Sequence, residues 1–68
     1  MLDGKKLQAL RKDAELTAEQ LGNAVGVSTS MILHMERGFK QPGAEVFCRI
    51  ADRLGVTVEE LRKRRTTQ

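Results

Sequence analysis

The sequence predicts an all-α fold of five short helices, packed as a single domain over residues 1–68. Capping residues recur at short intervals, and the segments between them repeat apolar residues three or four positions apart, as one face of a helix requires. The chain contains two phenylalanines but no tryptophan or tyrosine, so its core must be mainly aliphatic. A chain this small buries only ~60% of the surface that its unfolded form exposes, and no second domain for sensing or catalysis is expected.

Each of the first two helices begins at a capping residue. Asp3 can cap a helix of about residues 4–14. Thr17, with Gln20 three residues later, forms a capping box that begins a second helix. Gly26 suits the left-handed residue that ends this helix, which is therefore only about 8 residues long.

A third short helix follows almost immediately. Ser28 can cap a helix that runs to about Arg37 and is closed by Gly38. Residues 39–43 then form a loop, because Pro42 disfavours helix at the residue before it. The second and third helices are thus joined by a very tight turn, which is the arrangement of a helix-turn-helix.

The fourth helix is predicted by a single apolar face. This face has the i, i+3, i+4, i+7 spacing and consists of Phe47, Ile50, Ala51 and Leu54. Gly55 ends the helix, and Cys48 within it is expected to be a small buried core residue. Thr57 and Glu60 form a second capping box, which begins the last helix.

The composition argues against an enzyme, a metal protein and a membrane protein. The single cysteine and the single histidine are far apart and form no cluster of zinc ligands. No glycine-rich phosphate loop, catalytic carboxylate pair or serine–histidine–acid grouping can be assembled, so no cofactor is expected. No apolar stretch approaches the ~18 residues of a membrane-spanning helix, and no signal peptide is recognisable, which predicts a cytoplasmic protein.

The charge distribution is only weakly informative. A net charge of +3 and a pI near 9.5 slightly favour a nucleic-acid partner. Most of the excess lies in the run from Arg62 to Arg65, within a basic tail of residues 62–68. Such a run is either a solvated chain end or a phosphate-binding segment.

The stretch from Leu16 to Gly38 resembles the helix-turn-helix of the Cro and phage-repressor-like (XRE-type) family. The resemblance covers residues 5 to 61 and includes Leu7-Gln8-Ala9-Leu10-Arg11, Glu36-Arg37-Gly38, Pro42 and Ile50-Ala51-Asp52-Arg53-Leu54-Gly55-Val56. It implies a compact five-helix lambda-repressor-like domain with its helix-turn-helix at about residues 17–37.

Two positions depart from the family pattern. Gly22 stands where members usually carry alanine, at the tight contact between the two helices. Glycine fits there sterically, but it costs a helix ~1 kcal/mol relative to alanine, so the second helix is expected to be looser. Ala18 stands where many members have a glutamine that bonds a phosphate, so this contact is missing unless Thr17 or Gln20 replaces it.

The resemblance also implies which side chains meet DNA. The outward face of the third helix carries the expected base-reading residues, which are Thr29, Ser30, Leu33 and His34. The expected phosphate contacts are Thr17, Gln20, Ser28, Arg37, Lys40 and Gln41. None of the base-reading residues can form the bidentate hydrogen bonds that read guanine or adenine. Single hydrogen bonds from the hydroxyl groups and contacts of Leu33 with thymine methyl groups are therefore expected.

Arg11 and Glu36 form a separate pair of interest. Each lies one turn beyond an apolar residue, at the rim of a buried face, and each needs a partner there. The resemblance pairs them as a structural salt bridge that joins the first and third helices and orients the third. A solvent-facing, unpaired arrangement is the alternative.

These features predict a sequence-specific transcriptional regulator that binds double-stranded DNA, in the cytoplasm and on the nucleoid. By resemblance it is a repressor, acts as a homodimer on a palindromic operator, and needs no small-molecule effector. The fifth helix, with Val58 and Leu61, is the favoured dimer interface, although core packing explains both residues equally well.

Two further points stay open at this level. Phe39 is expected to cover the third and fourth helices, with a dimer contact as the alternative. A third helix that exposes Met31 and Leu33 would also suit another function, an antitoxin-like or other protein-interaction module with weak or no specific DNA binding.

Overall fold

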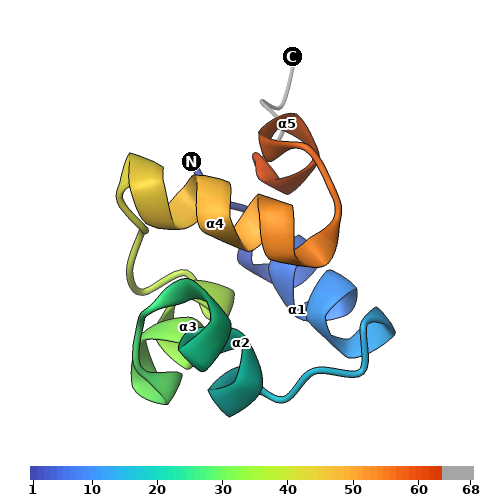
Figure 1. The fold of residues 1–68 in the computed structure, drawn as a ribbon. Helices are drawn as coiled ribbons and strands as arrows, with labels where there is room; N and C mark the ends of the chain where they lie inside the picture. Colours follow the sequence, from blue (N-terminus) through green and yellow to red (C-terminus); the bar gives the residue numbers. More distant parts are fainter. Residues whose placement is uncertain (64–68) are drawn as a thin grey trace.

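Five α-helices make up the fold in the computed structural model, which describes residues 1–63. They are α1 (Gly4–Asp13), α2 (Ala18–Val25), α3 (Thr29–Glu36), α4 (Ala44–Leu54) and α5 (Val58–Leu61) (Figure 1). Within this part of the chain the only extended pairing is one isolated bridge. The predicted all-α class and the five predicted helices are confirmed. The last five residues of the predicted basic tail, 64–68, lie outside the described residues.

The helices cross one another around a small core. α2 packs against α3 and α4, α1 packs against α3, and α4 packs against α5. Figure 1 shows α2 and α3 together at one end of the molecule, α5 at the other end, and α4 between them. The helix-turn-helix therefore lies at one end of the domain, where the other helices do not enclose it.

The predicted caps account for where the helices begin. Asp3 accepts hydrogen bonds from the N–H groups of Lys5 and Lys6 at the start of α1. The Thr17–Gln20 capping box is complete, and Ser28 accepts a bond from the N–H of the third residue of α3. Thr57 likewise caps α5, but in the described region only this half of the second predicted capping box forms.

The core is aliphatic, as predicted. Its buried residues come from every helix and from the N-terminal segment, and they are Leu2, Leu7, Leu21, Val25, Ile32, Met35, Ile50, Ala51 and Leu61. Leu61 is fully buried within one chain, so core packing explains it and it cannot also face a second subunit. Val58 is half-buried and packs against the same core.

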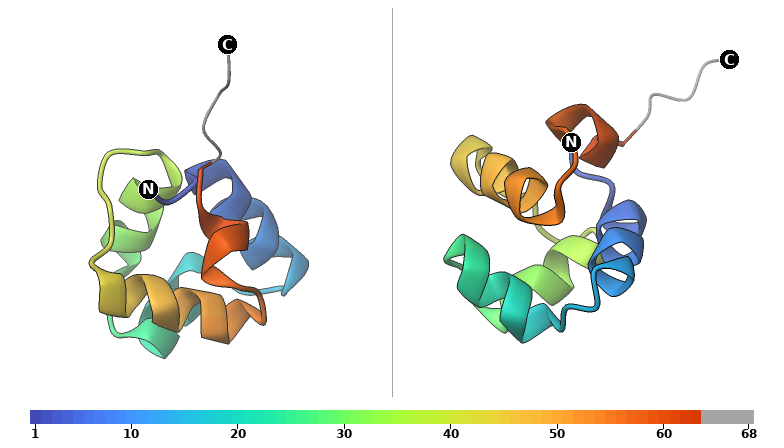
Figure 2. Two further views of the ribbon diagram at one scale, coloured as in Figure 1. Left: turned by 90° about the horizontal axis from the view of Figure 1, so that it is seen from above. Right: turned by 45° about the vertical axis from the view of Figure 1, so that its right-hand side comes forward.

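Residues 1–3, called here the N-terminal strap, were not expected to contribute to the core. Leu2 is only 2% exposed. The Asp3 N–H donates to the Leu61 carbonyl at 2.8 Å, and the Lys63 N–H donates to the Met1 carbonyl at 2.8 Å, so the strap pairs with the end of α5. The two turned views in Figure 2 show this strap running beside α5.

One expectation about these helices was wrong, and another agrees with the structure. Cys48 is exposed, not buried, because it lies about 100° around α4 from Phe47 and so falls beside the apolar face. Gly22 lies at a tight contact, as expected from the sequence. An added Cβ at this residue would lie 2.7 Å from the Val27 carbonyl oxygen, so the glycine lets α2 approach the turn closely.

Candidate nucleic-acid interface

The helix-turn-helix is formed by two eight-residue helices and a three-residue turn. α2 ends at Gly26 in the left-handed conformation, with φ of 82°, and α3 begins after its cap, Ser28. Leu21 from α2 and Ile32 from α3 are both 0% exposed. Their burial in the same core fixes the orientation of α3 relative to α2.

The outward face of α3 carries the four predicted base-reading side chains. Thr29 and Ser30 are exposed, Leu33 is 37% exposed, and His34 is half-buried. Met31, in contrast, is half-buried and packs against the core, so it is less available to a partner than its sequence position indicates. The outward face is thus a narrow row of two hydroxyls, one leucine and one imidazole, and it is called here the reading row after the contacts predicted for it.

His34 is partly covered by Phe39 from the following loop. The two rings lie with centroids 6.2 Å apart and planes at 56°. Gly38 has a φ of 82°, the Gly38 N–H donates to the Met35 carbonyl at 3.2 Å, and the Phe39 N–H donates to the His34 carbonyl at 2.9 Å. This is the Schellman pattern of a helix end, which brings together these two side chains.

The same turn shows that Phe39 does not cover the helices as the sequence analysis expected. The left-handed Gly38 directs the chain away from the core, and Phe39 is 71% exposed. A large aromatic side chain therefore stands in solvent next to the reading row. The interpretation of Phe39 as a core lid was wrong.

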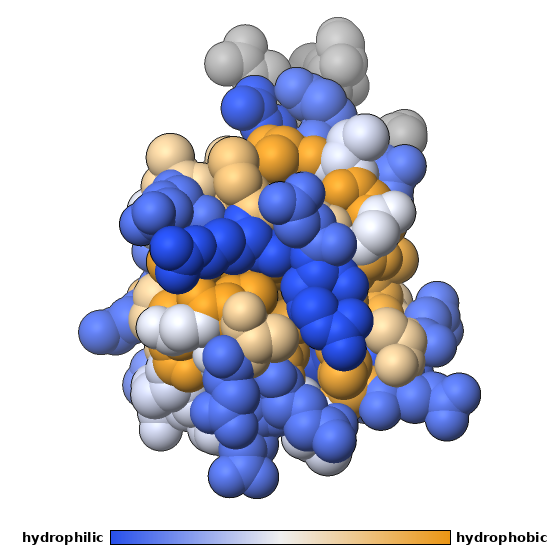
Figure 3. All heavy atoms as spheres, in the orientation of Figure 1, coloured by the Kyte–Doolittle hydropathy of each residue, from blue (hydrophilic) through white to orange (hydrophobic). Residues whose placement is uncertain are grey.

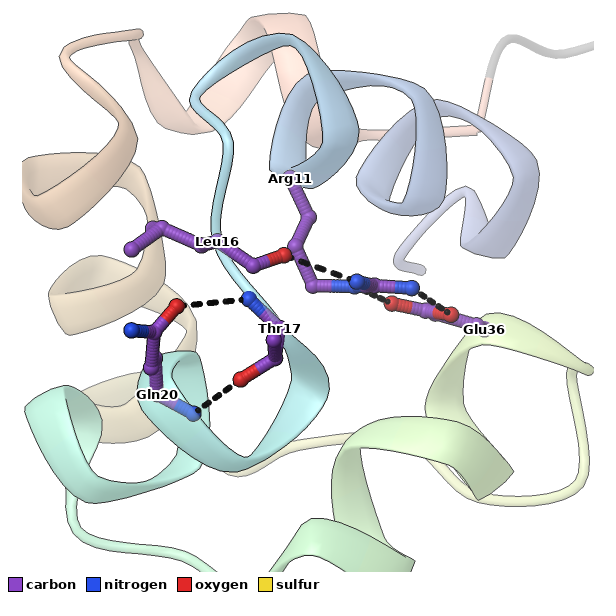
Figure 4. A network of polar contacts seen from close by, with 5 residues as sticks. All are labelled: Arg11, Leu16, Thr17, Gln20 and Glu36. Atoms are coloured by element: carbon purple, nitrogen blue, oxygen red, sulfur yellow. Dashed lines mark hydrogen bonds and ion pairs between the residues drawn. The ribbon is translucent and has the colours of Figure 1, made fainter.

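Arg11 from α1 and Glu36 at the end of α3 meet between these two helices (Figure 4). The Arg11 Nε donates to Glu36 Oε2 at 2.6 Å and Nη2 donates to Oε1 at 3.1 Å, while Nη1 donates to the Leu16 carbonyl at 2.9 Å. The side chains of Arg11 and Glu36 are only 10% and 3% exposed. One guanidinium thus joins α1, the segment before α2, and the end of α3, and this three-way contact is called here the clasp.

The electrostatics of the clasp favour the charged guanidinium. The hydrogen bond to Glu36 raises the pKa of Arg11, burial lowers it, and the charge of the carboxylate raises it further, with an upward net result. Two parallel bonds between a guanidinium and a carboxylate also fix the relative geometry of both side chains. α1 and α3 are therefore held together in one orientation.

The N-terminus of α2 provides the first group of predicted phosphate contacts. The capping box engages the N–H groups of Thr17 and Gln20, at 2.9 and 3.0 Å. In Figure 4 these two residues lie beside the clasp, with Thr17 at the start of α2 and Gln20 in its first turn. The N–H groups of Ala18 and Glu19 in the same turn have no intrahelical acceptor, so they remain as donors at the positive end of the helix.

The loop after α3 provides the second group. Arg37 and Lys40 are exposed. The Gln41 Oε1 accepts a hydrogen bond from the Leu2 N–H at 2.8 Å, which sequence reasoning missed because the two residues are 39 positions apart. Since this bond occupies the oxygen of the Gln41 amide, the NH₂ end remains as the donor. Ser28, the remaining candidate, is exposed and uses its hydroxyl oxygen to cap α3.

The exposed surface over the helix-turn-helix is mostly polar. In the space-filling view, hydrophilic and near-neutral side chains predominate over the lower part of the face, where α2 and α3 lie, and apolar ones gather higher up (Figure 3). In residues 1–63 no three side chains among His, Cys, Asp and Glu are grouped as metal ligands. No helix in this range is long and apolar enough to cross a membrane.

Comparisons with known proteins agree with this architecture. A family model described as a helix-turn-helix domain matches residues 4–64. The HTH-type transcriptional regulator YazB of Bacillus subtilis is 34% identical over 58 residues, which span 85% of this chain and 84% of that protein. A relative from Mycobacterium tuberculosis, the HTH-type transcriptional regulator Rv0474, is also 34% identical, but the match spans only 41% of its length.

Two solved structures show the same fold over most of their length. The P22 c2 repressor in complex with a synthetic operator superposes with a TM-score of 0.87 at 30% identity, covering 93% of this chain and 96% of that one. The restriction-modification controller protein C.AhdI from Aeromonas hydrophila gives a TM-score of 0.81 at 27% identity, covering 87% and 89%.

These likenesses confirm the predicted lambda-repressor-like five-helix fold. They also indicate the protein family to which the chain belongs. The two relatives are named as HTH-type transcriptional regulators, and the two structures are a repressor in complex with an operator and a controller protein. The chain belongs to the helix-turn-helix domain family of DNA-binding transcriptional regulators.

Proposed function

We propose that this protein is a repressor that binds a palindromic operator in double-stranded DNA as a homodimer, without a small-molecule effector. The observation that carries the proposal is the exposed row of Thr29, Ser30 and Leu33 on a short helix that the clasp and the core hold in one orientation. A side-chain row on a fixed helix can be inserted into the major groove in one register. The likeness to the P22 c2 repressor in complex with a synthetic operator supports this choice.

The proposed division of labour follows from the chemistry of the side chains. Thr29, Ser30, Leu33 and His34 read base edges through short hydrogen bonds and contact with thymine methyl groups. The phosphate contacts fix the protein on the duplex, and they are assigned to Thr17, Gln20, Ser28, Arg37, Lys40 and Gln41. Repression then follows from occupancy of the operator.

The homodimer is supported by an energetic argument. A single module of this kind buries only ~600–1,000 Å² on DNA. Base contacts that are not bidentate each contribute little binding free energy. Two subunits on one duplex turn the second binding event into an intramolecular one, which raises the overall affinity by orders of magnitude. A symmetric dimer in turn requires two inverted half-sites.

The experiment is a selection of bound sequences from a random duplex library, followed by sequencing. The proposal expects two inverted half-sites whose centres lie about 10 base pairs apart, one helical turn. Enrichment of a single unrepeated half-site would refute the dimer. Recovery of no preferred sequence would refute the sequence-specific reader.

A second function, binding of a protein partner, is favoured by one observation. Phe39 and Leu33 are large apolar side chains exposed near each other in sequence at the end of α3. Exposed apolar groups of this kind mark protein interfaces in other molecules. Salt dependence separates the two functions, because binding to DNA weakens steeply as salt rises, whereas binding through an apolar surface changes little.

A further inference from the structure

A surface hollow lies beside the C-terminal end of α3, where segments distant in the sequence meet. The N-terminal strap, the start of α1, the loop after α3 and the segment after α5 all line it. Three basic side chains are among the lining residues, and they are Lys5, Arg37 and Lys63. Lys5 was not recognised as a candidate contact from the sequence, and Lys63 was noted only as part of a basic run that is either solvated or phosphate-binding. Only the fold brings both lysines to the same hollow as Arg37.

The charges in the hollow leave cationic groups available. Both carboxylates that line it are already engaged, since Asp3 caps α1 and Glu36 is paired with Arg11. In contrast, Lys5, Arg37 and Lys63 form no ion pair with any residue in the range 1–63. Asp3 keeps its negative charge while it caps α1, and Glu36 is balanced by Arg11, so the three basic residues leave the lining with more positive than negative charge, which favours an anion.

A neutral donor adds to the same lining. Gln41 lines the hollow, and its Oε1 is bonded to the Leu2 N–H. The amide is therefore oriented with its NH₂ group as the remaining hydrogen-bonding end. The hollow thus offers donors and positive charge, the combination that binds phosphate oxygens.

The position of the hollow relative to the reading row indicates the source of the phosphate. Arg37 follows Ser30 by seven residues, so it lies about 10 Å further along the axis of α3, at a rise of 1.5 Å per residue. The major groove is about 12 Å wide. When the N-terminal half of α3 reads bases in the groove, its C-terminal end reaches the edge of the groove, which the phosphates form.

We propose that this hollow binds one DNA backbone phosphate at the edge of each half-site, with Lys5 and Lys63 joining Arg37 and Gln41 as its ligands. The proposal rests on the DNA-binding function proposed above. It adds the start of α1 and the segment after α5 to the interface. These contacts raise affinity for every duplex and carry no sequence information.

The test compares three single variants of the full chain, Lys5→Gln, Lys63→Gln and the control Lys12→Gln. Lys12 is also an exposed lysine of α1, but it does not line the hollow. By the counterion-release relation, each lost phosphate contact weakens binding about fivefold per monomer at 0.15 M salt and lowers the salt slope by about 0.9. Since the two lysines share one phosphate with Arg37, we expect a loss of up to this size for Lys5→Gln and for Lys63→Gln, on selected and random duplexes alike, with no loss for Lys12→Gln.

A second arm identifies the phosphate directly. A neutral methylphosphonate is placed at each backbone position of the selected duplex in turn. At one position per half-site it should weaken wild-type binding about fivefold, the value of one released counterion, and it should weaken Lys5→Gln less, because that variant has already lost part of its cationic contact with this phosphate. Inorganic phosphate should compete no better than chloride at equal ionic strength, because the ligand is a phosphate of the duplex.

The outcomes separate failure of this inference from failure of the proposed function. If the wild type selects an operator but Lys5→Gln and Lys63→Gln behave like Lys12→Gln, the hollow is not part of the interface and the DNA-binding function stands. Strong competition by inorganic phosphate would make the hollow a site for the free anion and overturn the assignment to DNA. If the wild type binds no duplex, both proposals fail. Unchanged thermal midpoints confirm that the variants are folded.

Discussion

Removing one partner of the clasp should cost more stability than any other polar substitution in the domain. Arg11→Met leaves the Glu36 carboxylate, only 3% exposed, without a counter-charge, and it also removes the bond to the Leu16 carbonyl. Breaking a buried ion pair in this way costs about 3–5 kcal/mol. A 68-residue domain has a total stability of about 3–10 kcal/mol, so this single change approaches the limit of folding.

The double variant Arg11→Met with Glu36→Leu should be much more stable than either single variant, because no charge is left stranded. Its remaining cost is mainly the lost bond to the part-buried Leu16 carbonyl, about 1 kcal/mol. The expected coupling energy between Arg11 and Glu36 is therefore at least ~3 kcal/mol, far above the value of a surface pair.

The assay is a double-mutant cycle by urea titration, with sulfate added if a single variant is unfolded in water. The matched control is the exposed pair of Arg49 and Glu45 on α4, whose side chains are 54% and 79% exposed. Removing Arg49 should cost no more than ~0.5 kcal/mol. Losses below 1 kcal/mol that add independently in the Arg11–Glu36 cycle would refute the clasp as a buried, coupled unit.

The clasp should also be insensitive to pH near neutrality. Because the pKa of Arg11 is raised on folding, the stabilisation from its charge is complete below the ordinary arginine pKa. It is lost only as the pH rises through the raised value, which is strongly alkaline. The coupling energy attributed to the guanidinium should therefore be the same at about pH 6 and about pH 9, and a steady decline between them would contradict this account.

Three further predictions concern the surface. Leu33→Ala should cost about 1–3 kcal/mol on the selected operator and little on random duplexes, and replacing the contacted thymines by uracil should weaken the wild type but not the variant; equal losses on all duplexes would contradict a base contact. Lys40→Ala should weaken binding to selected and random duplexes alike and lower the salt slope by about one per monomer, whereas unchanged affinity would place Lys40 off the interface. The exposed Cys48 should react with a thiol reagent in the folded protein about as fast as in denaturant, and strong protection would show that it is covered.

Local signals in the sequence predicted the helices well. Asp3, Thr17 and Ser28 each begin a helix because capping depends on residues within one turn, and such patterns can be read directly from the chain. The pairing of Arg11 with Glu36 came from a family resemblance, since residues 25 positions apart show no local sign of contact. The geometry that joins them to the Leu16 carbonyl came only from the structure.

The features that were missed depend on angle or on distant contact. Cys48 stands in an apolar segment, yet one helical step moves it off the buried face. Phe39 is apolar and follows a helix, but the left-handed residue before it turns the chain outward. The burial of Leu2 and the convergence of Lys5 with Lys63 both arise from pairing between the two ends of the described chain, which no periodicity reveals.

The pairing of the N-terminal strap with the end of α5 has a consequence for the order in which the domain folds. The contact between Leu2 and Arg62 closes a loop of nearly the whole chain. The chain must lose the conformational entropy of that loop before the contact can stabilise the fold. Contacts within the helix-turn-helix join near neighbours and form early. We therefore expect the strap to form late, after the transition state of folding. Loosening it should then speed unfolding and leave the folding rate unchanged, which stopped-flow folding and unfolding of a Leu2→Ala variant would check.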